Sequence, residues 1–185
     1  WEIHNVDCLD FLRTLPDGSV DLTVTSPPYD KIRDYGNNWT LDLPEVGRLL
    51  YSATSDGGIA AMVIQDGTES GAKTGTTART TCAWMDAGWR LWETCIYSKA
   101  GRPGAWWNKR FRVDHEFILV FVKGDRPSHF DKEPLKIPAK HAGATWHGTQ
   151  RRTDGGLDVV SPKIQADMKC RGTIWRYAGS NTEGN

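Results

Sequence analysis

The stretch that most constrains the fold of this chain is Thr25-Ser26-Pro27-Pro28-Tyr29, because it ends an alternating segment abruptly. Apolar and polar residues alternate from Val20 to Val24, which predicts a β-strand that ends at Thr25. Neither proline can donate to the hydrogen-bond ladder of a sheet, and Pro27 restrains Ser26 to an extended conformation. The strand therefore ends in a stiff loop that presents a hydroxyl, backbone carbonyls and an aromatic ring.

Such a loop has the chemistry to hold an exocyclic amine, and ligands of α/β sheets bind at the carboxyl ends of strands. The amine of a nucleobase is a weak nucleophile because its lone pair is delocalised into the ring. Ser26 and the carbonyl of Pro27 can accept its two hydrogens and favour the pyramidal form. Tyr29 can stack on a base drawn out of the duplex, worth roughly 1–3 kcal/mol. A proline-rich turn with a surface tyrosine is the alternative interpretation.

The same five residues resemble motif IV of the amino-methylating DNA methyltransferases, which carry Asp, Asn or Ser before Pro-Pro-Tyr. Residues 3–12 are similar to the segment that those enzymes place one strand earlier, and residues 15–21 are similar to their lead-in to motif IV. The resemblance implies S-adenosylmethionine as the methyl donor. It also implies a set of catalytic residues, namely Ser26, Pro27, Pro28 and Tyr29.

The resemblance implies cofactor binding by Asp7, Cys8 and Ser26. In the family, an acidic residue that matches Asp7 approaches the adenosine part of the donor. An N-cap for a helix that starts near Cys8 is a second role for Asp7, and both roles can hold together.

Apolar periodicity predicts strands that alternate with helices. The expected strands cover 2–5, 21–25, 58–65, 89–98 and 114–123, and the expected helices cover 8–15, 43–53 and 76–87. This alternation implies parallel pairing, with antiparallel strands near the end of the chain. Segments 58–66, 88–99 and 114–124 follow the order of motifs VI, VII and VIII. The resemblance therefore implies an α/β, Rossmann-like methyltransferase fold with a doubly wound, mostly parallel sheet.

Composition predicts a soluble cytoplasmic protein without metal. The chain of 185 residues suffices for one core with an appended lobe, and it contains no run of eighteen apolar residues and no secretory signal. Its four cysteines form no Cys-x-x-Cys pair, which argues against zinc and for buried, reduced thiols. The resemblance implies a prokaryotic or phage-encoded protein.

Charge and tryptophan are unevenly distributed along the chain. Residues 1–125 carry 13 basic against 17 acidic residues, a net charge of −4, whereas residues 126–185 carry 10 against 6, a net charge of +4. A basic C-terminal part suits contact with phosphates, although ordinary variation of surface charge is an alternative. Among the nine tryptophans, we expect Trp84, Trp89 and Trp92 in the core and Trp146 in a binding loop.

Two loops are candidates for DNA contact. The loop 101–112 is rich in cations and aromatic rings that can lie along a phosphate backbone: Arg102, Trp106, Trp107, Lys109 and Arg110. A solvated loop with both tryptophans folded onto the core is the alternative. Arg33 and Tyr35 follow the proline-rich loop, where the resemblance implies a lid over the base and the cofactor. A surface loop that contacts neither DNA nor the cofactor is the alternative for that segment.

We expect three divisions of the chain. Residues 1–125 form the catalytic region, residues 126–171 form an irregular target-recognition region, and residues 172–185 return toward a cofactor-binding half. Arg151 and Arg152 of the second region are candidates for DNA contact. The glycine-rich motif I and motif X of the family are not found, and the Gly-rich segment 71–75 lacks the preceding strand that a cofactor loop needs. A fragment, a split enzyme with a second polypeptide and a silent remnant remain open.

The sequence thus predicts methyl transfer from S-adenosylmethionine to a flipped base of double-stranded DNA. Serine at position 26 tilts the prediction slightly toward cytosine N4 over adenine N6. A non-catalytic DNA-binding fragment or remnant is the alternative. The recognition sequence, a homodimer and a paired nuclease are left open.

Overall fold

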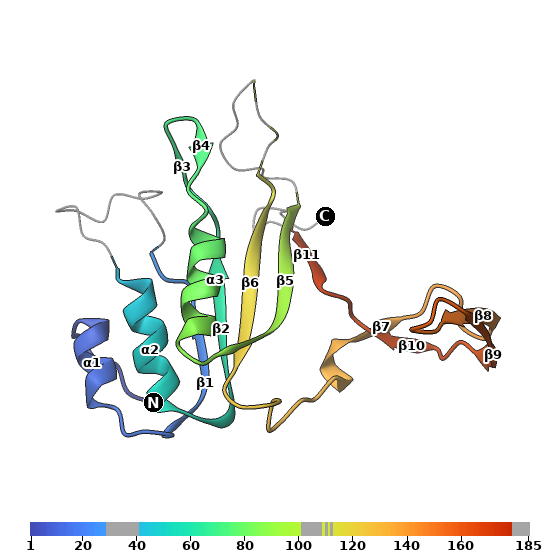
Figure 1. The fold of residues 1–185 in the computed structure, drawn as a ribbon, viewed down its shortest axis with the longest axis horizontal. Helices are drawn as coiled ribbons and strands as arrows, with labels where there is room; N and C mark the ends of the chain where they lie inside the picture. Colours follow the sequence, from blue (N-terminus) through green and yellow to red (C-terminus); the bar gives the residue numbers. More distant parts are fainter. Residues whose placement is uncertain (29–40, 101–108, 110, 112, 179–185) are drawn as a thin grey trace, which may run out of the picture. The chain divides into compact units, whose positions relative to one another are not determined.

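The computed structural model describes residues 1–28, 41–100, 109, 111 and 113–178. The chain divides into two compact units (Figure 1). The body comprises Trp1–Phe130 and Thr173–Asn185, and the insert comprises Asp131–Gly172.

A five-stranded sheet forms the centre of the body, in the order β1-β2-β6-β5-β11. Its strands are β1 (Val20–Thr25), β2 (Thr54–Ile64), β5 (Arg90–Ala100), β6 (His115–Val122) and β11 (Ile174–Ala178). β1 pairs in parallel with β2, β11 pairs in parallel with β5, and β6 runs antiparallel to both of its neighbours. Four strands therefore point in one direction and one is reversed, which confirms the mostly parallel α/β fold.

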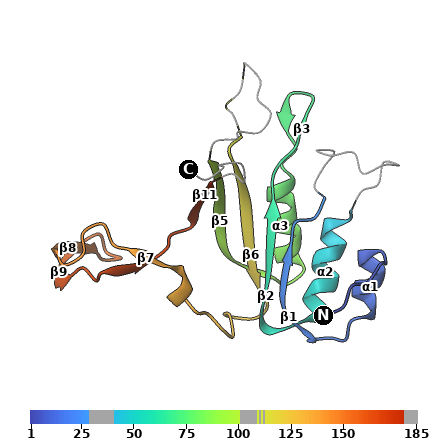
Figure 2. The ribbon, with the colours of Figure 1, turned by 180° about the vertical axis from the view of Figure 1, so that it is seen from behind.

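Three helices accompany this sheet, namely α1 (Cys8–Thr14), α2 (Leu43–Ala53) and α3 (Thr76–Asp86). Figures 1 and 2 show α2 and α3 on the same face of the sheet, with α1 beside α2. All three helices match their predicted positions within one residue. The strand predicted at 2–5 was wrong, because these residues are exposed and have no strand partner among the described residues.

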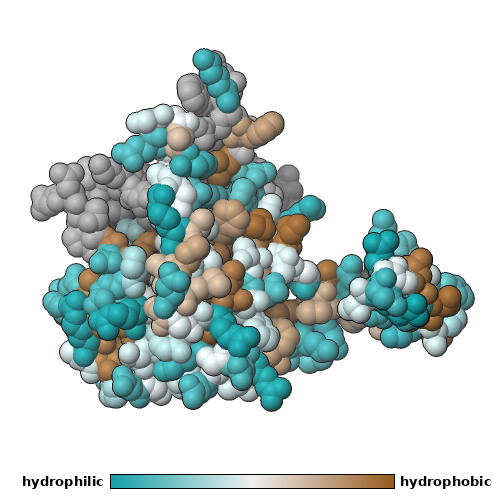
Figure 3. All heavy atoms as spheres, in the orientation of Figure 1, coloured by the Kyte–Doolittle hydropathy of each residue, from teal (hydrophilic) through white to brown (hydrophobic). Residues whose placement is uncertain are grey.

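The core lies between the helices and the sheet. Trp84, Phe121, Met62 and Ile64 are each 0% exposed. The indole Nε1 of Trp84 donates to the carbonyl of Leu43 at 2.9 Å, so the polar edge of this ring is satisfied inside the core. The helices therefore cover this face, and Figure 3 shows teal, white and tan residues mixed on their outer surface.

Two of the three tryptophans predicted in the core are buried there. Trp89 is 2% exposed and donates from Nε1 to the carbonyl of Gly47 at 2.9 Å, and Trp84 stacks on it at 5.6 Å between ring centroids. The prediction was wrong for Trp92, which is 44% exposed. The register of β5 against β6 shifts between Leu91 and Glu93, and this bulge interrupts the alternation at Trp92.

The opposite face of the sheet is uncovered at its β1 edge. Leu22 and Val24 are 60% and 71% exposed, and their register partners on β2 are Ile59 and Ala61. Figure 2 shows no described helix of the body over this face of the sheet at β1. The described helices thus form one of the two helical layers that a doubly wound sheet carries.

The insert is built from antiparallel pairs, which agrees with the antiparallel strands expected near the end of the chain, although the region 126–171 was expected to be irregular. A short 3-10 helix, η1 (Glu133–Leu135), precedes β7 (Lys136–Pro138), which pairs with β10 (Met168–Cys170). A longer hairpin joins β8 (Thr145–Arg151) to β9 (Leu157–Ile164). The body carries one more small hairpin, β3 (Thr68–Glu69) and β4 (Ala72–Lys73), whose second strand falls in the Gly-rich segment 71–75 that was rejected as a cofactor loop. Trp146 lies on β8 rather than in a loop and is 53% exposed.

The cysteines are all free, but only Cys95 is buried. The prediction of buried thiols was therefore wrong for Cys8, Cys82 and Cys170. In the part of the chain that the structure describes, no three His, Cys, Asp or Glu side chains gather to hold a metal ion. The longest described helices, α2 and α3, have 11 residues each and cannot span a bilayer.

Candidate active site

The site begins where β1 ends. Thr25 makes the last register pair of β1, with Met62 of β2, and the chain leaves the sheet at Ser26. Pro27 is buried and Pro28 is half-buried, whereas Ser26 is exposed. The two prolines therefore anchor the loop against the body while the hydroxyl of Ser26 remains accessible.

The N-terminus of α1 forms the opposite side of the site. Asp7 is the N-cap of this helix, and its Oδ1 accepts from the backbone N–H of Leu9 at 2.9 Å and of Asp10 at 3.4 Å. The N-cap role expected for Asp7 is therefore confirmed. No described residue donates to its second carboxylate oxygen, which leaves that oxygen available to a ligand.

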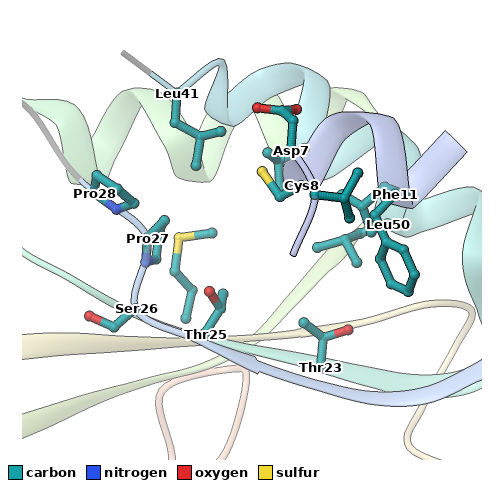
Figure 4. Close-up of a pocket in the computed structure, with 14 residues that line it drawn as sticks. Asp7, Cys8, Phe11, Thr23, Thr25, Ser26, Pro27, Pro28, Leu41 and Leu50 are labelled. Carbon is teal, nitrogen blue, oxygen red and sulfur yellow. The ribbon is translucent and has the colours of Figure 1, made fainter. Parts of the chain in front are cut away.

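The two sides enclose a pocket of about 630 Å³ (Figure 4). In Figure 4, Ser26, Pro27 and Pro28 line one side, and Asp7 and Cys8 line the other. The remaining lining residues are mostly apolar: Val6, Phe11, Leu12, Thr23, Thr25, Leu41, Val46, Leu50 and Met62. A largely apolar pocket with a few polar groups at its rim is typical of a small-molecule site.

The thiol of Cys8 faces conditions that favour its neutral form. Desolvation of the sulfur, and secondly the negative charge of Asp7, raise the pKa of Cys8 above its ordinary value. A thiolate is the nucleophilic form of cysteine, so this position is poorly suited to covalent catalysis. Cys8 is therefore best regarded as a wall of the pocket.

The predicted catalytic and cofactor-binding residues that the structure describes all line the pocket: Asp7, Cys8, Ser26, Pro27 and Pro28. Tyr29 lies outside the described residues, and so do the predicted DNA contacts Arg33, Tyr35, Arg102, Trp106, Trp107 and Arg110. Lys109 is described and exposed. Arg151 and Arg152 belong to the insert and are exposed.

Sequence reasoning missed the apolar wall of the pocket. Val46 and Leu50 lie four residues apart on α2 and therefore share one face of that helix. Met62 comes from β2, and its register partner Thr25 lines the pocket beside it. The spacing on α2 signals a core face, but only the assembled fold shows that this face also reaches a ligand pocket.

The chemistry of these residues fits S-adenosylmethionine. The apolar wall can cover the adenine ring, and the unshared oxygen of Asp7 can accept from a ribose hydroxyl. Both features lie within one pocket of sufficient size for a drug-sized ligand.

Comparison with known families supports this interpretation. The sequence model of the N6/N4 DNA methylase family matches residues 20–183. The chain is 35% identical over 108 residues to the orphan methyltransferase M.BamHII of Bacillus amyloliquefaciens, over 58% of this chain and 40% of that protein. It is 29% identical to the type II methyltransferase M.BglII of Bacillus subtilis, over 95% of this chain and 48% of the relative. The chain thus spans about half the length of the relatives that it matches.

Solved structures have the same fold. The cytosine-N4-specific PvuII DNA methyltransferase matches with a TM-score of 0.59 at 16% identity, over 97% of this chain and 57% of its own. The complex of M1.HpyAVI with SAM matches with a TM-score of 0.52 at 17% identity, over 72% and 58%. Because the family match extends over residues 20–183 of 185, this chain belongs to the N6/N4 DNA methylase family.

Proposed function

We propose that this protein methylates the exocyclic amine of a base in DNA, with S-adenosylmethionine as donor. The observation that carries the proposal is the position of Ser26 and Pro27, which leave the carboxyl end of β1 and line the same pocket as the N-terminus of α1. A reacting amine and a methyl donor would therefore lie within one cavity. Membership in the DNA methylase family supports this assignment.

In the proposed mechanism, Ser26 and the carbonyl of Pro27 accept hydrogen bonds from the two hydrogens of the amine. These contacts hold the amine in its pyramidal form and stabilise the positive charge that develops on nitrogen. Pro28 fixes the loop, which keeps both acceptors in position. No covalent bond to the enzyme is required, because the amine itself is the nucleophile.

S-adenosylmethionine, when bound, supplies an electrophilic methyl group. Asp7 would hold its adenosine part through the carboxylate oxygen that α1 does not use, and the apolar wall from Val46, Leu50 and Met62 would exclude water. The neutral thiol of Cys8 adds a further uncharged surface beside Asp7.

The target base would reach the pocket by leaving the duplex, with Tyr29 stacked on its face. Cytosine N4 is slightly favoured over adenine N6, because position 26 carries Ser rather than Asp; the preference is only slight, since Ser at this position of the family also occurs with adenine N6.

We further propose that a polypeptide segment beyond these 185 residues completes the donor site. The exposed side chains of Leu22 and Val24 at the β1 edge suit a further strand and helix. The lengths of M.BamHII and M.BglII leave room for such a segment. The proposed partner is double-stranded DNA, and a homodimer is compatible with every feature above.

The complete gene product should transfer labelled methyl from S-adenosylmethionine to DNA, and digestion should identify the modified nucleoside. Ser26→Ala removes one acceptor of the amine and should slow transfer roughly 100-fold, the usual effect of removing one group that stabilises a developing charge. DNA that gains label in no base, across varied sequences, would refute methylation and favour a DNA-binding remnant.

Asp7 and Asp42 provide a matched pair for the donor site. Both are N-caps, and Asp42 Oδ1 accepts from the N–H of Glu45 at 3.0 Å, but only Asp7 lines the pocket. Because asparagine caps helices as well as aspartate does, Asp7→Asn and Asp42→Asn should both leave the melting temperature unchanged. Only Asp7→Asn should weaken S-adenosylmethionine binding, by about tenfold or more, since a hydrogen bond to a charged group is lost. Equal binding by both variants would remove Asp7 from the site.

A further inference from the structure

Arg151 and Arg152 have identical chemistry but different surroundings. Arg152 donates from Nε to Asp154 at 3.2 Å and from Nη1 to Asp158 at 3.1 Å. Its backbone N–H donates to the carbonyl of Gly156 at 2.8 Å, and its carbonyl accepts from Gly155 at 3.0 Å. Arg152 therefore fastens the turn between β8 and β9 from both its backbone and its side chain.

Arg151, one residue earlier, is exposed and has no ion pair with any residue that the structure describes. Its register partner on β9 is Leu157, which is 61% exposed. The two nearest carboxylates of the turn, Asp154 and Asp158, are already engaged by Arg152. The charge of Arg151 is therefore uncompensated at the tip of the hairpin.

The register assigns the remaining side chains of the hairpin to two faces, because alternate residues of a strand point to opposite sides. On one face the side chains contact one another, although they stay largely exposed. This face carries Trp146, whose ring lies across Gly148 and leaves no room for a Cβ there, together with Val160 and the Arg152–Asp158 pair.

The other face, called here the open face, has no such packing. It carries Thr145, His147, Thr149 and Arg151 from β8, and Leu157, Val159 and Ile164 from β9. Its three apolar members are 61%, 87% and 75% exposed in the same order, and apolar surface of the insert is visible in Figure 3. The open face contains no acidic residue, and residues 131–172 together carry 8 basic against 5 acidic residues.

We propose that the open face of the β8–β9 hairpin enters the major groove of DNA, that Arg151 contacts the DNA there, and that Arg152 only braces the turn. The inference rests on the proposed function and specifies how the insert meets its partner. A two-stranded ribbon fits the width of a major groove. Exposed threonines and an unpaired arginine can donate to base edges or phosphates, and apolar side chains can contact thymine methyl groups. An acidic residue on this face would repel the DNA.

Thr149 and Gln150 provide the matched test, because they are adjacent, exposed and on opposite faces of the same strand. In the full-length protein, Thr149→Glu should weaken binding to duplex DNA at least tenfold, whereas Gln150→Glu should change it less than threefold. Each variant's melting temperature is measured alongside. Equal DNA affinity of the two variants, or a loss of melting temperature by Thr149→Glu without loss of DNA binding, would overturn the proposal.

The two arginines give a second comparison. Arg151→Ala should lower DNA affinity at an unchanged melting temperature, and it should either reduce the salt dependence by about one phosphate contact or relax the methylated sequence at one base. Arg152→Ala should instead loosen the hairpin, seen as faster amide exchange at Gly155 and Gly156. An Arg151→Ala protein with wild-type affinity, salt dependence and sequence preference would contradict the assignment. Wild-type protein that methylates no DNA would refute the proposed function itself, which separates the two failures.

Discussion

The two faces of the central sheet carry similar side chains in different surroundings. On the helix-covered face, Met62, Ile64 and Phe121 are completely buried. On the opposite face, at the β1 edge, Leu22 and Val24 are 60% and 71% exposed. The two faces differ because described helices cover only one of them, while both carry apolar side chains. Strands with apolar side chains on both faces are typical of sheets that are covered on both sides. The apolar pattern of these strands therefore predicts a second covering layer on the β1 side of the sheet, which the described helices do not form.

The stability of the described fold therefore comes mainly from the helix-covered face of the sheet. Burial of an apolar side chain contributes about 1.5–3 kcal/mol, and the largest fully buried side chains lie under the helices. Substitutions on that face should be costly, and the same kind of substitution at the β1 edge should not be.

The largest effect is expected for Trp84→Ala. Trp84 packs on Phe121 at 4.9 Å and on Trp89 at 5.6 Å between ring centroids, and it is 0% exposed. Its removal leaves a large cavity and should lower the free energy of unfolding by about 3–5 kcal/mol, measured by chemical denaturation. Trp84→Phe keeps a ring but loses the hydrogen bond to Leu43, so its loss should be smaller. A loss below 1 kcal/mol for Trp84→Ala would contradict a core on this face.

An intermediate effect is expected for Gly47→Ala on α2. Alanine is the better helix former by about 1 kcal/mol, so an open position would gain stability. A Cβ at position 47, however, would lie 2.5 Å from Cδ1 and Nε1 of Trp84. Overpacking of a core costs about 1–3 kcal/mol, so the net change should be destabilising. Unfolding measurements on this variant that found increased stability would imply that Trp84 moves aside easily.

Much of the body was predictable from local patterns. Apolar periodicity and capping residues located α1, α2 and β1, because Asp7, Asp42 and the Pro27-Pro28 pair act within a few residues of themselves. Antiparallel strands were expected near the end of the chain, but the sequence did not identify β6 as the reversed strand, since strand direction depends on pairing with β2 and β5, which are distant in sequence.

The strand positions in the insert and the apolar wall of the pocket escaped prediction for another physical reason. β8 and β9 bury almost nothing, so their residues follow no burial pattern that sequence periodicity can detect. The wall combines residues of α2 and β2 that meet only in the folded chain. The polar side of the pocket was predictable, since Asp7 and Ser26 stand at the ends of elements that the sequence delimits clearly.

The smallest effect, and the sharpest test of the comparison between the faces, is expected for Val24→Thr. Threonine has nearly the shape of valine and a high preference for strands, so the substitution changes little except polarity. At 71% exposure the hydroxyl remains hydrated, and the free energy of unfolding of this 185-residue chain should change by less than about 0.5 kcal/mol.

The control is Val122→Thr, where the side chain is 0% exposed and the buried hydroxyl should cost about 1–3 kcal/mol. In the complete gene product, a segment packed on β1 would bury position 24, and Val24→Thr should then approach the cost of the control. An effect below 0.5 kcal/mol in both proteins would mean that nothing covers this edge, and the proposed completing segment would have to bind elsewhere.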